Sequence, residues 1–393
     1  MMTGPVLMAF AWVVRPVGAW TSRLTTLRPS SSLAMSTSSS TISYEHCLSR
    51  LTTLQTLLQK HGAPGSIDCG KAEDLVAVSN PLETPELVAD LVHAPELENL
   101  HPYLLPIAQS QSKKDTFICA YRNPFVEESD KKHPWPIVEA KVNGPGMRLL
   151  ALNTEHLMRR IACEADAADD GNTDVIDIYN DGLGKGLVAD SALDVPYEKG
   201  AVEKLGYGVD KYVLLRVGPF ADLYQTMAEQ HAAKGDEQSS LISAEACNSK
   251  LAGFGSNFLY YAQLLSKFPN REEEARDAAR MCLRMPLPTI GLTLDDFCQV
   301  AILSQAADKG DSPKEALPKL RALYEKMREV ETEENIGQAD GKTLEQMAID
   351  EANVILDQAV LDGLSWGEVR PMVAEKFRKV GREDFARFVE MQN

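Results

Sequence analysis

Closely spaced helix start and stop signals fill the chain from Pro219 to its end, and they restrict this part to short helices joined by tight turns. Apolar residues recur at helical spacing between Phe220 and Met227, and Lys234-Gly235 suits a helix end. Further start signals lie at Ser243, Asn270, Thr293, Ser312, Thr343 and Ser365. Pro318 is expected to limit the helix that Ser312 starts. The pattern predicts a helical-hairpin domain over residues 216–393.

One of these hairpins carries a pattern of small residues on its second helix. The sequence predicts helices over 257–268 and 271–285, separated by a turn, and the second helix places Ala275, Ala279 and Cys282 on one side. This spacing resembles a unit of the tetratricopeptide repeat family, in which small residues of the second helix pack on the first. The resemblance implies a TPR-like, α-solenoid-like stack of hairpins whose surface binds other proteins.

The resemblance covers about 30 residues and departs from the family pattern in two places. Pro286 comes one residue early for the closing proline, and Gln263 replaces a small residue of the first helix. The hairpins begin near residues 219, 257 and 293, but the next one, near 343, breaks this spacing. An ordinary all-α domain with unequal hairpins is therefore the alternative interpretation.

The region before the hairpins changes its apolar period from helix to strand. A predicted helix starting at Ser43 ends at Gly62, and another start signal lies at Thr84-Pro85. Strands are predicted over 116–121, 136–142, 148–152 and 174–179, with a helix over 154–164. We expect residues 43–215 to form an α+β domain with a small, mainly antiparallel sheet. The whole chain is thus expected to be α+β and predominantly α.

The leader of the chain, residues 1–42, has the composition of a cleaved targeting sequence. No Asp or Glu occurs before Glu45, and an apolar stretch within residues 1–19 is signal-like, whereas residues 20–42 are Ser/Thr-rich and basic. This order, with Trp20 opening the second part, resembles presequences of nuclear-encoded plastid proteins in algae with complex plastids. It implies import into the plastid, with the stroma as destination. The alternatives are a mitochondrial presequence and translation from Met35, which leaves the protein cytosolic.

Composition excludes several classes of function. The formal net charge of −17 disfavours nucleic acid as a partner, because phosphate backbones bind Lys and Arg. Beyond the leader, no stretch reaches membrane-spanning length, so a soluble protein is expected. The seven cysteines form no close pair of the kind that zinc sites need. No cofactor or metal is predicted, and a thiol switch between distant cysteines is left open.

A glycine-rich loop is the best single candidate for a ligand site. Gly182, Gly184, Lys185 and Gly186 follow the predicted strand 174–179 and are expected to present backbone N–H groups to an anion. The segment lacks the spacing of a nucleotide-binding P-loop. The acidic stretch Asp166–Asp177 matches a calcium loop only in part, because Ala168 removes a ligand. A solvated acidic loop is the preferred interpretation there.

Presequence, hairpins and the lack of a catalytic motif together predict a non-enzymatic plastid protein. It is expected to act as an assembly or scaffold factor that binds other plastid proteins, those of a photosynthetic complex included, through its helical-repeat surface. The competing hypothesis is a plastid enzyme, or a binding protein, for an anionic small molecule held near the loop Asp181–Gly186.

Overall fold

The computed structural model describes residues 50–78, 95–124, 135–168, 174–181, 183, 193–334 and 342–390. The chain divides into two compact units, Met1–Thr37 and Ser38–Asn393, and every described residue belongs to the second. The leader 1–42 and the predicted helix start at Thr84-Pro85 lie outside the described residues.

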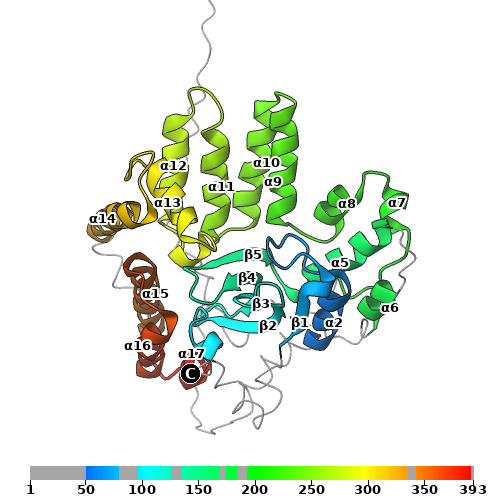
Figure 1. The fold of residues 1–393 in the computed structure, drawn as a ribbon, viewed down its shortest axis with the longest axis horizontal. Helices are drawn as coiled ribbons and strands as arrows, with labels where there is room; N and C mark the ends of the chain where they lie inside the picture. Colours follow the sequence, from blue (N-terminus) through cyan, green and yellow to red (C-terminus); the bar gives the residue numbers. More distant parts are fainter. Residues whose placement is uncertain are drawn as a thin grey trace, which may run out of the picture. The chain divides into compact units, whose positions relative to one another are not determined.

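A five-stranded antiparallel sheet organises the first part of the described chain (Figure 1). Its strands follow one another in chain order: β1 (Leu75–Ala77), β2 (Leu104–Ser110), β3 (Thr116–Tyr121), β4 (Ile137–Lys141) and β5 (Met147–Ala151). The three predicted strands 116–121, 136–142 and 148–152 are β3, β4 and β5. The sequence did not reveal β2, since nearly all its residues are buried and its pairing with β3 shifts between Pro106 and Ala108. That burial removes the alternation that identifies a half-exposed strand.

Each face of the sheet is covered by different helices. On one face Ile118 and Ile137 pack in a core with leucines of α2 (Leu51–His61) and with α5 (Thr154–Ala168). On the other face Cys119 and Val138 pack against the helices that follow the sheet domain in sequence. Because both faces are buried, the residues of β4 are almost completely hidden from solvent, and a polar side chain there needs an internal partner.

The predicted strand 174–179 is wrong, because these residues form helix α6 (Asp174–Asn180). Its β-branched residues resemble a strand, but Val175, Ile176 and Tyr179 are the buried ones, which is one face of a helix. The helix packs on α2 and α5. Two more helices, α7 (Ala201–Leu205) and α8 (Val209–Arg216), complete this region.

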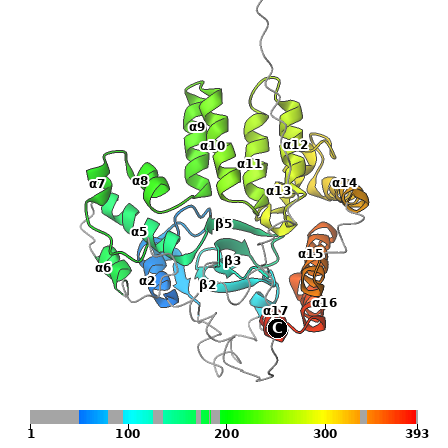
Figure 2. The ribbon, with the colours of Figure 1, turned by 180° about the vertical axis from the view of Figure 1, so that it is seen from behind.

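The second half of the described chain is helical, as predicted. It contains α9 (Ala221–Ala233), α10 (Glu237–Lys250), α11 (Gly255–Leu265), α12 (Glu272–Cys282), the 3-10 turn η2 (Leu287–Thr289), α13 (Leu294–Leu303), α14 (Pro313–Glu334), α15 (Leu344–Asp362), α16 (Trp366–Lys379) and α17 (Glu383–Glu390). Consecutive helices pack on each other as hairpins, visible from both sides in Figures 1 and 2. The predicted class is confirmed: α+β, predominantly α, with a small antiparallel sheet followed by helical hairpins. A tetratricopeptide-type repeat stays a prediction.

Most of the predicted helix starts are confirmed by side-chain caps. Thr293, Thr343 and Ser365 each form a reciprocal capping box with the residue three positions on. Ser243 is not a start: α10 begins at Glu237, where the Asp236 carboxylate accepts the N–H of Ser239. Asp236 was missed as the cap because helix starts at 236 and at 243 fit the same apolar pattern.

Pro318 does not limit its helix, since α14 continues past it to Glu334. The missing proline N–H deprives only the carbonyl of Lys314, four residues earlier, of its helical partner. Both residues are exposed, so water can satisfy this carbonyl.

Helices α16 and α17 contact residues that lie much earlier in the chain, close to the sheet. Fully buried Arg370 of α16 donates to the backbone carbonyls of Glu98, Leu100 and Val389. Arg122, just after β3, forms an ion pair of 2.8 Å with Asp384 of α17. The C-terminal helices therefore do not continue as an open row of hairpins but contact segments that flank the sheet.

Within the described residues, none of the helices combines the length and the apolar character that crossing a membrane requires.

Candidate functional site

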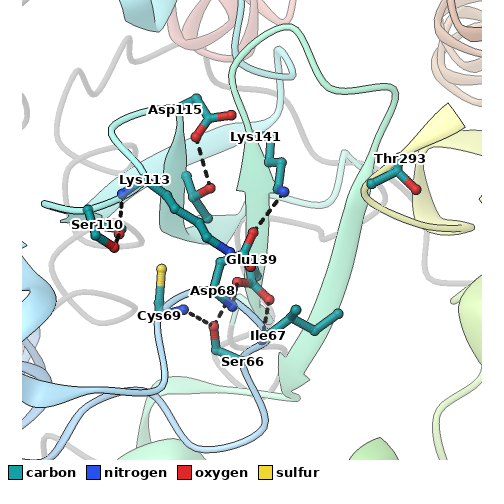
Figure 3. A network of polar contacts seen from close by, with 12 residues as sticks. Ser66, Ile67, Asp68, Cys69, Ser110, Lys113, Asp115, Glu139, Lys141 and Thr293 are labelled. Carbon is teal, nitrogen blue, oxygen red and sulfur yellow. Dashed lines mark hydrogen bonds and ion pairs between the residues drawn. The ribbon is translucent and has the colours of Figure 1, made fainter.

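A buried carboxylate on β4 holds the loop around Ile67 in place (Figure 3). Glu139 of β4 has 0% of its surface exposed. One of its oxygens accepts the hydroxyl of Ser66 at 2.7 Å and the N–H of Asp68 at 2.9 Å, and the other accepts the N–H of Ile67 at 3.1 Å. Three donors on one carboxylate replace the water that this group loses on burial.

The loop also closes on itself. The hydroxyl of Ser66 accepts the N–H of Cys69 at 2.7 Å, and the N–H of Ala63 donates to the carbonyl of Cys69 at 3.0 Å. Gly62 begins the loop at a φ of 91°, and a Cβ on it would lie 2.3 Å from the carbonyl oxygen of Gly70. Only glycine fits both this backbone conformation and this approach.

Two lysines fix the carboxylate of Asp68 from outside the loop. Lys113, in the turn between β2 and β3, forms an ion pair with it, and Lys141 of β4 lies 2.7 Å from its second oxygen. Burial acts to raise the pKa of Asp68, but the hydrogen bonds and charges of the two lysines outweigh it and hold this pKa below its ordinary value. Asp68 is therefore ionised at neutral pH.

The network orders the loop, and neither the thiol of Cys69 nor the hydroxyl of Ser66 is activated as a nucleophile. Burial, with the Glu139 charge beside it, raises the pKa of the Cys69 thiol to about 12, so the thiol stays protonated at neutral pH. The hydroxyl of Ser66 is already engaged with Glu139. What faces the solvent is the side chain of Ile67, 63% exposed. The arrangement can present an apolar side chain on a rigid backbone.

Replacing Glu139 by Gln is expected to lower the free energy of unfolding by on the order of 3 kcal/mol, because an amide has one acceptor oxygen for three donors and carries no charge. Urea unfolding measures this change, and faster amide exchange at residues 66–69 locates it. Glu375→Gln, at a position whose side chain is 62% exposed, is the matched control with an expected change below about 0.5 kcal/mol. Equal effects of the two substitutions would contradict the anchoring role.

A second polar cluster lies where the sheet domain, η2 and α15 meet. It surrounds a pocket with room for about one water molecule. The pocket is lined by His101, Tyr103, Tyr121, Met147, Pro286, Pro288, Thr289, Asn353, Leu356 and Asp357. The hydroxyl of Tyr103 is buried and forms no hydrogen bond with the described residues. A single ordered water is the ligand that such a pocket suits.

Burial shifts the titration of two groups at this pocket in opposite directions. Burial, with the Arg370 charge adding to it, lowers the pKa of His101 to about 3, and the ring Nδ1 accepts the N–H of Tyr103. Burial raises the pKa of Asp357 to about 6, although the Tyr324 hydroxyl and the N–H of Leu287 each donate to it at 2.7 Å. At neutral pH His101 is uncharged and Asp357 is charged.

The structure does not test the candidate anion loop. Gly182, Gly184, Lys185 and Gly186 lie outside the described residues. The described part of this segment follows helix α6, not the predicted strand, and the N–H of Asp181 donates to Asp177 in the last turn. Anion binding by these glycines stays a prediction.

At the start of the acidic stretch that resembles a calcium loop, the side chain of Asp166 already accepts hydrogen bonds within the protein. The carboxylate of Asp166 accepts the hydroxyl of Tyr197 at 2.6 Å and the N–H of Gly200. Residues 169–173 lie outside the described part. Over the described ranges, no group of three or more His, Cys, Asp or Glu side chains is placed to hold a metal ion.

The three residues of the repeat-like pattern are all buried. Ala275 and Ala279 pack in a core with Ala262 of α11, while Cys282 lies in a neighbouring core and its thiol donates to the carbonyl of Gly255 at 3.5 Å. Their packing in the manner of a tetratricopeptide unit stays a prediction.

Sequence reasoning missed the loop at Ile67 and the cluster at Asp357. A signal for the first was available, since Gly62, Pro64 and Gly65 mark a turn and Glu139 interrupts an apolar strand. No local signal marked the second, because its residues come from separate segments spread between His101 and Asp357.

Three family models match consecutive parts of this chain. PAB N-terminal matches residues 89–215, the PAB middle domain matches 221–307, and the PAB C-terminal domain matches 320–392. The chain is also 29% identical over 295 residues to the Arabidopsis thaliana protein named "Protein IN CHLOROPLAST ATPASE BIOGENESIS, chloroplastic". This match covers 74% of this chain and 79% of that protein. No solved structure matches the chain.

Proposed function

We propose that this protein is a plastid assembly factor that binds another protein during biogenesis of the chloroplast ATPase and acts without catalysing a reaction. The similarity to the Arabidopsis protein carries this proposal, because it extends through most of both chains and its printed name states that process. The acid-free leader 1–42 supports a plastid location, with the stroma as the compartment.

The clusters of the described residues support binding by surface. In the Glu139 network, the hydroxyl of Ser66 and the carboxylate of Glu139 already form a hydrogen bond with each other. The pocket at Asp357 has room for about one water molecule. We propose that residues 216–393 act as the helical-repeat part and 43–215 as the α+β part. The gap between the first two family matches, 215 to 221, supports this boundary.

Depleting the protein in the cells that make it tests the proposal. The amount of assembled ATPase on native gels is expected to fall severalfold while its subunits are still synthesised and a second photosynthetic complex is unchanged. A chain lacking residues 1–42 serves as the control, because it should fail to restore the ATPase when it cannot enter the plastid. Normal ATPase levels after depletion would refute the proposal.

A further inference from the structure

We propose that Ile67 is the central contact of a docking surface for a protein that offers an apolar pocket bordered by carboxylates. This inference rests on the proposed function and adds to it the place and the chemistry of the contact. The docking surface consists of Ile67 and the side chains of Lys113 and Lys141.

The backbone beneath Ile67 is fixed before any partner arrives. The N–H of Ser66 donates to Ala63, those of Ile67 and Asp68 donate to Glu139, and that of Cys69 donates to the hydroxyl of Ser66. A contact residue on an ordered backbone loses little conformational freedom on binding, which favours affinity. The fold thus places a buried carboxylate on β4, beside the central strand of the sheet, to hold a loop whose outward side chain is apolar.

The charges around Ile67 determine the chemistry of the partner. The side chains of Lys113 and Lys141 are 51% and 24% exposed, whereas the carboxylate side chain that both contact, on Asp68, is 4% exposed. Glu139 is completely buried. The two ammonium groups are thus more exposed than the Asp68 carboxylate with which they pair, and Figure 3 shows both lysines reaching the loop that carries Ile67.

These two lysines contrast with the chain as a whole, whose formal net charge is −17. A partner with an acidic surface is repelled by the chain as a whole and attracted at the two lysines, so it approaches in one orientation. A second copy of this acidic chain is the weaker candidate for the same reason.

Binding of the purified full chain to each purified subunit of the chloroplast ATPase, measured one subunit at a time, tests the proposal. Ile67→Ala is expected to weaken the binding of one subunit about 30-fold, as truncation of a central contact does. Ile242→Ala is the matched control, because Ile242 on α10 is 56% exposed and the same substitution there should change affinity less than about twofold. Both variants should keep the wild-type melting temperature, because the truncated side chains are exposed.

The lysines give an independent readout. Lys113→Gln should slow association and reduce its dependence on salt, because a rim charge acts mainly on the association rate. Equal affinities of the wild type and Ile67→Ala would overturn the docking surface and leave the proposed function standing. Failure of the wild type to bind any subunit would overturn both, and an effect of Ile67→Ala on self-association alone would assign the surface to a second copy.

Discussion

Arg370→Ala is expected to lower the free energy of unfolding by about 4 kcal/mol, the largest single effect anticipated for this protein. The guanidinium reaches three backbone carbonyls from a fully buried position and joins α16 to the segment around residue 100. Burial lowers the pKa of Arg370 to about 9, which is still above neutral, so the group remains charged. Without it, three carbonyls, two of them in buried hydrogen bonds, lose their donor and a cavity opens.

Urea unfolding with a fluorescence or circular dichroism signal measures this loss. Arg370→Lys should recover only part of the stability, because one ammonium group cannot reach three carbonyls with the geometry of the planar guanidinium. Arg378→Ala is the control on the same helix, since its side chain is 40% exposed and its ion pairs are superficial. If Arg378→Ala proved as damaging as Arg370→Ala, the contact with the sheet domain would not be what stabilises these helices.

Asp357→Asn is expected to change how stability depends on pH. The pKa of this group is about 6 in the folded protein, above the ordinary value of 3.8, so the folded state holds the proton more tightly than the unfolded state. The contribution of Asp357 to stability is therefore greatest below pH 3.8, falls as the pH rises towards 6, and is constant above that. The total cost of ionising it is about 3 kcal/mol.

The asparagine can keep the contacts to Leu287 and Tyr324 but cannot ionise. Between pH 4 and pH 7 the free energy of unfolding of the variant should rise relative to the wild type by about 2 kcal/mol, as measured by urea unfolding at both pH values. Tyr324→Phe should act in the opposite sense, because it removes a donor that stabilises the carboxylate. A difference between Asp357→Asn and the wild type that does not vary with pH would show that this carboxyl is not costly to ionise.

The sequence predicted the features that are local. Residues such as Thr343 and Ser365 identify helix starts because the cap and its partner lie three positions apart. Strands β3 and β5 were visible through their apolar period and the turns beside them. The α6 segment was misread because β-branched residues outweigh the helical spacing in so short a stretch.

The parts that sequence reasoning missed depend on distant partners. Nothing near Arg370 in the chain indicates that two of its acceptors, the carbonyls of Glu98 and Leu100, lie 272 and 270 residues earlier. Nothing near Glu139 indicates that its donors come from residues 66–68. A charged residue in an apolar segment shows only that some partner exists. Which partner it is depends on the three-dimensional arrangement of the elements.

The return of the C-terminal helices to the sheet domain also determines when this protein can finish folding. Glu98 and Arg370 are 272 positions apart, so a chain that is being synthesised exposes the carbonyls of Glu98 and Leu100 long before α16 emerges. During that interval the aromatic surface around Tyr103 has no cover from α16 and α17. The unfinished chain therefore needs protection from aggregation until its last helices arrive.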